Sequence, residues 1–255
     1  MKTKTVALVV LVVLGLVSFM SWSIAADKEP PALAQFDEDA AQSRRVVRDY
    51  CAIVQEMMME PQLDKVKQEK GLALLVDAVN KWKTVQQKYG DNPPKEYAAD
   101  TTFKARLQDF ANALEDMQKA LAAGQVRRSM MACGFGCGLF VAMHEDNGLT
   151  YALDSLFHFR KSMMKNAGSV MKTRGLEGVR KILPSLTQKR DVVLLSPLPW
   201  ADGDQRLKPY LDALKQVSQT FDEWVLAVTS GNAAEAGKLH KRLMELINNV
   251  YGLAL

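Results

Sequence analysis

Residues 39–60, DAAQSRRVVRDYCAIVQEMMME, decide the fold class. Apolar residues recur in this segment every three or four positions, the spacing of a helix that buries one face. They are Val46, Val47, Tyr50, Ile53, Val54, Met57 and Met58. The same spacing recurs over residues 63–89, 101–123 and 125–145. A loop rich in Gly, Asn and Pro at 90–100 and a break at Gly124 separate these segments, so the sequence predicts four helices between residues 36 and 147.

The second half of the chain repeats this plan. Residues whose numbers differ by 104 match in type: Met59 with Met163, Gly71 with Gly175, Asp100 with Asp204, Phe103 with Leu207, and Phe110 with Leu214. The Pro-rich loop recurs at 196–204, and Gly124 matches Gly231 after a three-residue insertion. We therefore predict an all-α protein of two tandem up-down four-helix bundles, over residues 36–147 and 148–255.

Residues 1–26 have the features of a secretory signal peptide. Lys2 and Lys4 precede an apolar run at 6–17, and small residues at Ser23 and Ala25 precede a polar stretch. We expect cleavage after residue 25 or 26 and export, to the periplasm of a bacterium. The alternative is an uncleaved anchor, which would be the protein's attachment to the membrane.

The composition excludes several classes of function. The chain has 255 residues, is 48% hydrophobic and carries a net charge of only +4, which gives no reason to expect nucleic-acid binding. Three cysteines are too few for a disulfide scaffold. The sequence has no Gly-rich phosphate loop, Ser-His-Asp order or carboxylate pair that would mark an enzyme, so we predict a protein without catalytic residues.

Residues 159–171, FRKSMMKNAGSVM, resemble the first helix of cytochromes c-prime. That helix begins with an aromatic residue and an arginine, followed by a methionine, a glycine and a second methionine. The matching positions are Phe159, Arg160, Met164, Gly168 and Met171. The four-helix bundles and their long loops agree with that family and with its relative, the soluble four-helix cytochrome b.

The chain departs from that family at the haem attachment site, because it has no Cys-x-x-Cys-His motif. Covalent haem is therefore not expected. The resemblance implies a non-covalent haem in the first repeat, with His144 as one axial ligand. A methionine of the first helix would be the other ligand, and the candidates are Met57, Met58 and Met59.

Residues 130–148, MMACGFGCGLFVAMHEDNG, contain a cluster of soft metal ligands. In a helix Cys133, Cys137 and His144 point in similar directions, and Cys51 lies on a helix expected to be adjacent. Thiolates and an imidazole suit copper(I) or zinc. The alternative is that Cys51 pairs with Cys133 or Cys137 in a disulfide, or that the thiols are simply buried.

Two functions follow from these features. The first is an exported cytochrome c-prime-like protein that binds haem, copper or zinc in its first repeat, for electron transfer to a redox partner or for ligand sensing. The alternative is a haem-less periplasmic interaction or scaffold protein without a cofactor, whose duplicated bundles contact an envelope partner. Either function is compatible with a homo-oligomer.

Overall fold

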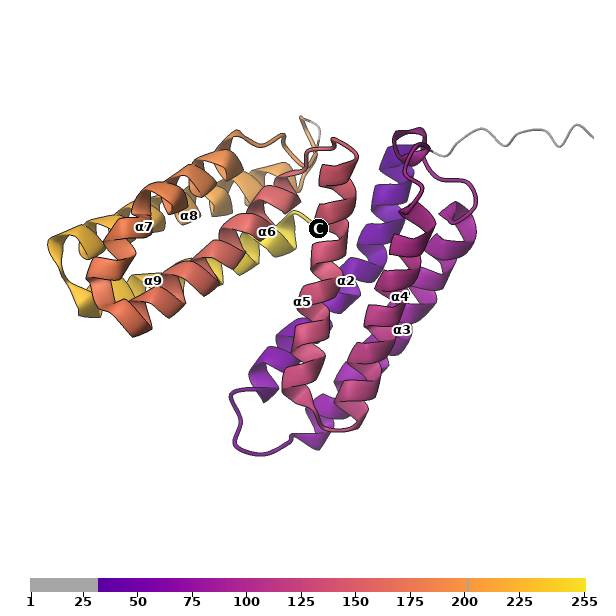
Figure 1. The fold of residues 1–255 in the computed structure, drawn as a ribbon, viewed down its shortest axis with the longest axis horizontal. Helices are drawn as coiled ribbons and strands as arrows, with labels where there is room; N and C mark the ends of the chain where they lie inside the picture. The colour runs from indigo at the N-terminus through magenta and orange to yellow at the C-terminus, as the bar shows by residue number, and fades with distance from the viewer. Residues whose placement is uncertain (1–31, 201) are drawn as a thin grey trace, which may run out of the picture. The chain divides into compact units, whose positions relative to one another are not determined.

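The computed structural model describes residues 32–200 and 202–255, and every regular element within them is helical (Figure 1). The predicted all-α class is therefore confirmed, and the described residues contain no strand. The predicted signal peptide at 1–26 lies outside the described residues. No helix in the described part of the chain is both long enough and apolar enough to cross a membrane.

The first half of the chain packs four helices around one core. They are α2 (Leu33–Met57), α3 (Lys65–Tyr89), α4 (Phe103–Ala122) and α5 (Val126–Asp146), with a short 3-10 helix, η1 (Lys95–Tyr97), before α4. Each helix contacts the next along the chain, and α5 contacts α2, so the four helices close into a ring.

Aromatic side chains fill the interior of this ring. The Trp82 and Phe110 rings lie 4.3 Å apart, and the Phe110 and Phe140 rings 5.1 Å apart. The Trp82 indole N–H also donates a hydrogen bond of 2.8 Å to the Leu107 carbonyl, so this buried polar group is satisfied. The core of the first half is therefore a packed aromatic layer.

The second half packs its helices around a separate core. They are α6 (Ala152–Ser162), the π-helix η2 (Met163–Gly168), α7 (Ser169–Leu195), α8 (Leu207–Ser230) and α9 (Ala233–Leu253). The helix α6 contacts α7 and α9, and α8 contacts α7 and α9. The largest side chains of this core include Trp224, Phe221, Phe159 and Tyr210.

Within α7 the chain reverses direction at a single residue, Gly175. Its backbone angles, φ 61° and ψ −163°, lie in a region that is essentially restricted to glycine. Gly71, predicted as its equivalent, is instead helical and buried in α3, where an added Cβ would lie 2.9 Å from Leu121 Cδ2. Residues 57–75 and 162–179 are therefore not structurally equivalent. The connection between the first two helices falls at different positions of the match in the two halves.

We predict that Gly175→Ala lowers the free energy of unfolding by about 1–3 kcal/mol, because alanine would be forced into a strained conformation. The matched control is Gly237→Ala in α9, where an added Cβ meets nothing within 4 Å. That control should stabilise the protein by about 0.5–1 kcal/mol. Urea unfolding measures both, and an equal effect of the two substitutions would contradict the strain at Gly175.

Candidate functional site

Cys51 on α2 and Cys133 on α5 form a disulfide, with their Cα atoms 6.7 Å apart. Cys137, one turn further along α5, has a free, half-buried thiol. The disulfide takes two thiolates out of the predicted ligand set of Cys51, Cys133, Cys137 and His144, because disulfide sulfurs are not thiolate donors. The prediction that all four residues bind a metal is therefore wrong for Cys51 and Cys133. The alternative prediction of a disulfide is confirmed. The described residues hold no other group of three or more His, Cys, Asp or Glu arranged for a metal.

His144, near the end of α5, is buried, and its partners come from the segment that follows. Its Nδ1 lies 2.8 Å from Oδ2 of Asp154 on α6. Its ring lies against Tyr151, with centroids 4.2 Å apart, and close to Phe140. The imidazole therefore links α5 to α6.

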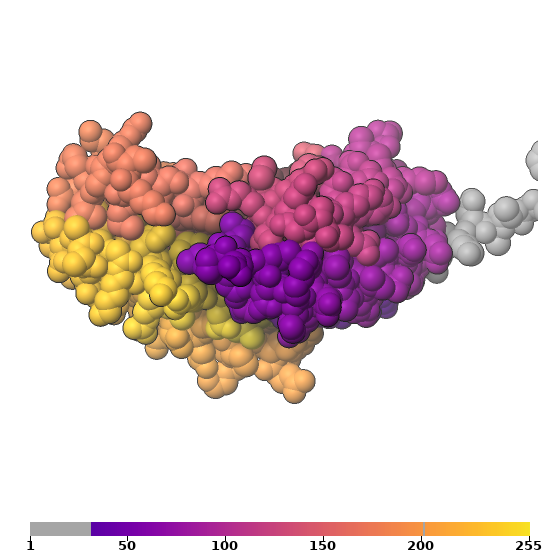
Figure 2. Space-filling model, turned by 90° about the horizontal axis from the view of Figure 1, so that it is seen from below, coloured from indigo at the N-terminus to yellow at the C-terminus, as the bar shows by residue number. Residues whose placement is uncertain are grey.

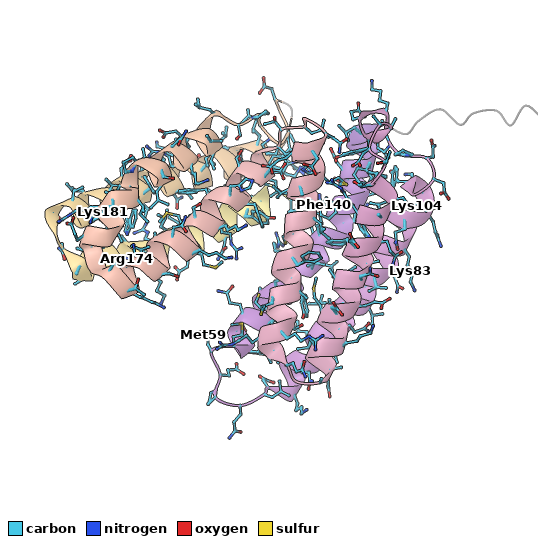
Figure 3. The ribbon with its side chains drawn as sticks, viewed as in Figure 1. Met59, Lys83, Lys104, Phe140, Arg174 and Lys181 are labelled. Carbon is cyan, nitrogen blue, oxygen red and sulfur yellow. A yellow bond between two sulfur atoms is a disulfide. The ribbon has the colours of Figure 1, made fainter. Side chains whose placement is uncertain are left out.

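The predicted pairing of His144 with Met57, Met58 or Met59 is wrong. Because α2 and α5 are antiparallel, the start of α2 meets the end of α5, and the end of α2 meets its start. Arg44 thus stacks on Phe140 at 4.3 Å, whereas Met57 and Met58 share a hollow with Val126 and Met131. Counted along α2, the methionines lie about 25 Å from the level of His144. Figure 3 shows Met59 and Phe140 far apart along this group of helices.

The side chains present therefore do not fit the implied haem. Only His144 remains of the predicted axial pair, and the interior beside it is filled by the Trp82, Phe110 and Phe140 rings. A porphyrin would have to displace this aromatic layer. The first half of the chain thus offers neither the second ligand nor the space that the resemblance implied.

A second, half-buried pair lies next to His144. The Tyr151 hydroxyl donates a hydrogen bond of 2.7 Å to Oδ2 of Asp37 on α2. Burial raises the pKa of the Asp37 carboxyl, although Tyr151, His144 and Arg44 each act to lower it. Burial likewise raises the pKa of the Tyr151 hydroxyl, with a further contribution from the Asp37 carboxylate. The segment after α5 is therefore tied to the start of α2.

The two pairs, together with the neighbouring side chains of Arg44 and Tyr97, form a group that we call the polar cluster. Three buried polar atoms of the polar cluster lack a protein partner. They are Arg44 Nη2, the Tyr97 hydroxyl and Asp154 Oδ1. Buried polar groups are nearly always hydrogen-bonded, so these three atoms are exceptions within the protein. A hollow of about 450 Å³, lined by Arg44, His144 and Tyr151 among others, opens beside them. The sequence pointed to His144 but could not reveal this cluster, because its members come from distant segments and the others belong to no motif.

Two further contacts connect α2 to the C-terminal end of the chain. Arg48 Nη1 donates a hydrogen bond of 2.8 Å to the Gly252 carbonyl, and Arg45 Nε donates one of 2.7 Å to the Leu255 carbonyl. In the space-filling view, α2 in indigo adjoins α9 in yellow (Figure 2). The polar cluster and these contacts help to join the two halves.

The outer side of α5 carries an exposed apolar surface. Met131 is 72% exposed and Phe135 is 58% exposed. Between Arg128 and Glu145 the helix has no Lys, Arg, Asp or Glu. Successive residues of a helix are rotated by about 100° around its axis, and the residues of this surface lie within about 60° of the direction of Met131. We call this surface the α5 apolar face, and its members are Met131, Gly134, Phe135, Gly138 and Ala142.

The glycines of α5 have different surroundings. Gly136 faces the core, where an added Cβ would lie 3.3 Å from Phe110 Cε2, so internal packing accounts for it. Gly134 faces outward, and an added Cβ would meet nothing within 4 Å. A helical glycine costs about 1 kcal/mol relative to alanine. Packing within the chain therefore does not explain Gly134.

The chain matches no family model, no curated protein and no solved structure with which it was compared.

We predict that Cys51→Ala/Cys133→Ala lowers the free energy of unfolding by about 4–5 kcal/mol in the chain-entropy account of a cross-link. The disulfide joins residues that are 82 positions apart, so it restricts the unfolded chain strongly. Cys137→Ala is the control and should cost less than about 1 kcal/mol. Urea unfolding measures both, and equal losses would contradict the assignment. Thiol labelling of the denatured protein should find one thiol before reduction and three after it.

We predict that Asp37→Asn gains stability relative to the parent protein as the pH rises. Folding raises the pKa of the Asp37 carboxyl above its ordinary value of 3.8. The carboxyl therefore binds its proton more tightly in the folded state than in the unfolded state. Its contribution to stability is therefore present below that pKa and is lost as the pH rises through the folded-state value. Urea unfolding from about pH 4 to 7 measures the difference. A difference between Asp37→Asn and the parent protein that stays constant over this pH range would refute the prediction.

Proposed function

We propose that the chain is an exported, haem-less interaction protein that acts by contact through its helical surfaces. The observation that carries the proposal is the α5 apolar face, an exposed helix surface without charge over sixteen consecutive residues, 129–144. Exposed apolar patches on water-soluble helices commonly mark sites of protein association. Met131 and Phe135 are mostly exposed, so their side chains contribute little to the core of the first half.

The residues that the sequence predicts as cofactor ligands support the same proposal. Cys51 and Cys133 are used by the disulfide, and His144 is used by its contact with Asp154. Met57, Met58 and Met59 lie at the opposite end of the helices from His144. Apart from Cys137, whose thiol is free, the residues that suggested a centre thus have structural roles or lie too far apart to share a ligand.

We further propose that the two halves are four-helix bundles related by duplication. Each half has its own hydrophobic core. The helices α4 and α8 begin at Phe103 and Leu207, and α5 and α9 begin at Val126 and Ala233. These starts agree with the offset of 104 residues and the later three-residue insertion. The resemblance to cytochromes c-prime would then be one of architecture, with the haem site lost.

Export is supported by the disulfide. Disulfides form and persist in oxidising compartments such as the periplasm and are rare in the cytosol. Residues 1–26 would supply the signal, as the sequence predicts. Both features favour a protein of the bacterial periplasm, with an envelope protein or a second copy as its partner.

An absorption spectrum tests the proposal against the cofactor alternative. The protein is purified from the periplasm after expression with haem supplied, and iron, copper and zinc are measured in the same sample. We expect no Soret band and less than stoichiometric metal, because the ligands are engaged or too far apart. A Soret band that shifts on reduction, is lost in His144→Ala and persists in His158→Ala would overturn the proposal. Stoichiometric copper or zinc would overturn it as well.

A further inference from the structure

We infer that the α5 apolar face docks on the same face of a second copy of the chain, with the two α5 helices antiparallel. This inference rests on the proposed interaction function and names its partner. Three features carry it: the charges at the two ends of the face, the order of large and small residues along it, and its exposure.

The two ends of the face carry opposite charge. Arg127 and Arg128 precede the face, and Glu145 and Asp146 follow it. All four residues fall within about 60° of the direction of Met131 on a helix. A parallel pair of α5 helices would bring arginine to arginine and acid to acid. An antiparallel pair brings the arginines of each copy to the acids of the other, so charge selects the antiparallel arrangement.

The register set by these charges also matches large residues with small ones. If Arg127 lies opposite Asp146, and Arg128 opposite Glu145, then Met131 lies opposite Ala142 and Phe135 opposite Gly138. The two copies are then related by a two-fold axis, and each contact occurs twice. Gly138 has no side chain of its own, so the ring of the other copy would fit beside Phe157 of α6, whose Cζ would lie 3.9 Å from an added Cβ at Gly138. The outward Gly134, which packing within the chain does not explain, further lowers the surface for a close helix approach.

The charged ends are available for such contacts. Within the described residues, Arg127 has no ion pair, and Arg128 has only a 3.4 Å hydrogen bond to Gln125. Glu145 and Asp146 pair on the surface with His158 at 2.8 Å and Arg106 at 2.5 Å. Exposed pairs contribute only about 0–1 kcal/mol, so a second partner can be accommodated at low cost.

The apolar surface continues past one end of the face. Met58 is 42% exposed and Met59 is 85% exposed. Met58 lines, with Met131, a hollow of about 640 Å³ next to the start of α5. In the antiparallel pair this region receives the end of α5 of the other copy. Because one helix pair covers less than the roughly 1,200 Å² of a stable interface, the dimer belongs to the weak class.

Sedimentation equilibrium of the full chain over a concentration series tests the inference. We expect wild-type protein to change from monomer to dimer as its concentration rises. Phe135→Glu should weaken association by about tenfold or more, because it places a charge against Gly138 of the other copy. Leu226→Glu on α8, where the leucine is 69% exposed, is the matched control and should leave the dimer unchanged.

A charge exchange tests the pairing of the ends. Arg127→Glu/Arg128→Glu and Glu145→Arg/Asp146→Arg should each be monomeric alone, because their ends repel in a homodimer. An equimolar mixture of the two variants should dimerise, because each end then meets its opposite charge. Thermal unfolding of each variant confirms that it is folded.

Three outcomes would overturn the inference. One is a wild-type protein that stays monomeric throughout the series, and another is a dimer that Phe135→Glu does not weaken. In the third, the protein is a monomer that binds vesicles of phosphatidylethanolamine and phosphatidylglycerol, and Phe135→Glu abolishes this binding. That result would show that the α5 apolar face binds lipid. All three leave the absorption spectrum unchanged, so failure of this inference is distinct from failure of the proposed function.

Discussion

The antiparallel packing of α2 against α5 is the constraint on which the rest of the structure depends. The Cys51–Cys133 disulfide joins the two helices covalently, and the hydroxyl groups of Tyr50 and Ser129 form a hydrogen bond one turn away. This seam closes the first ring of helices. It also fixes which end of α2 meets the end of α5 that carries His144. The polar cluster, the link to α6 and the outward direction of the α5 apolar face all follow from that alignment.

The sequence predicted the helices of the first half closely, because each buries one periodic apolar face. The segments expected at 63–89, 101–123 and 125–145 correspond to Lys65–Tyr89, Phe103–Ala122 and Val126–Asp146. Periodicity reports which side of a helix is buried and does so locally. It does not report which residue of a distant helix lies opposite, so it could not test the pairing of His144 with the methionines at the end of α2 that the resemblance implied.

The reversal at Gly175 was hidden for a related reason. A glycine within a helical pattern has the same letter whether it allows close packing, as Gly71 does, or a sharp turn. The partner of His144 was hidden because Asp154 is an ordinary acidic residue in the first turn of a helix. The cysteine pairing was available from the sequence as an alternative, since helix adjacency and an oxidising compartment allow it. The structure decides it by placing Cys133 rather than Cys137 beside Cys51.

The two halves differ in how their first two helices are connected, and this difference bears on how the chain can change over evolution. In the first half residues 58–64 form the connection between α2 and α3, and a connection of that kind absorbs insertions at small entropic cost. In the second half the connection is one residue with a backbone conformation reserved for glycine. Added residues there would have to unwind a helix or shift its buried face. We therefore expect the first of the two connections to tolerate insertions and the second to require both its length and its glycine.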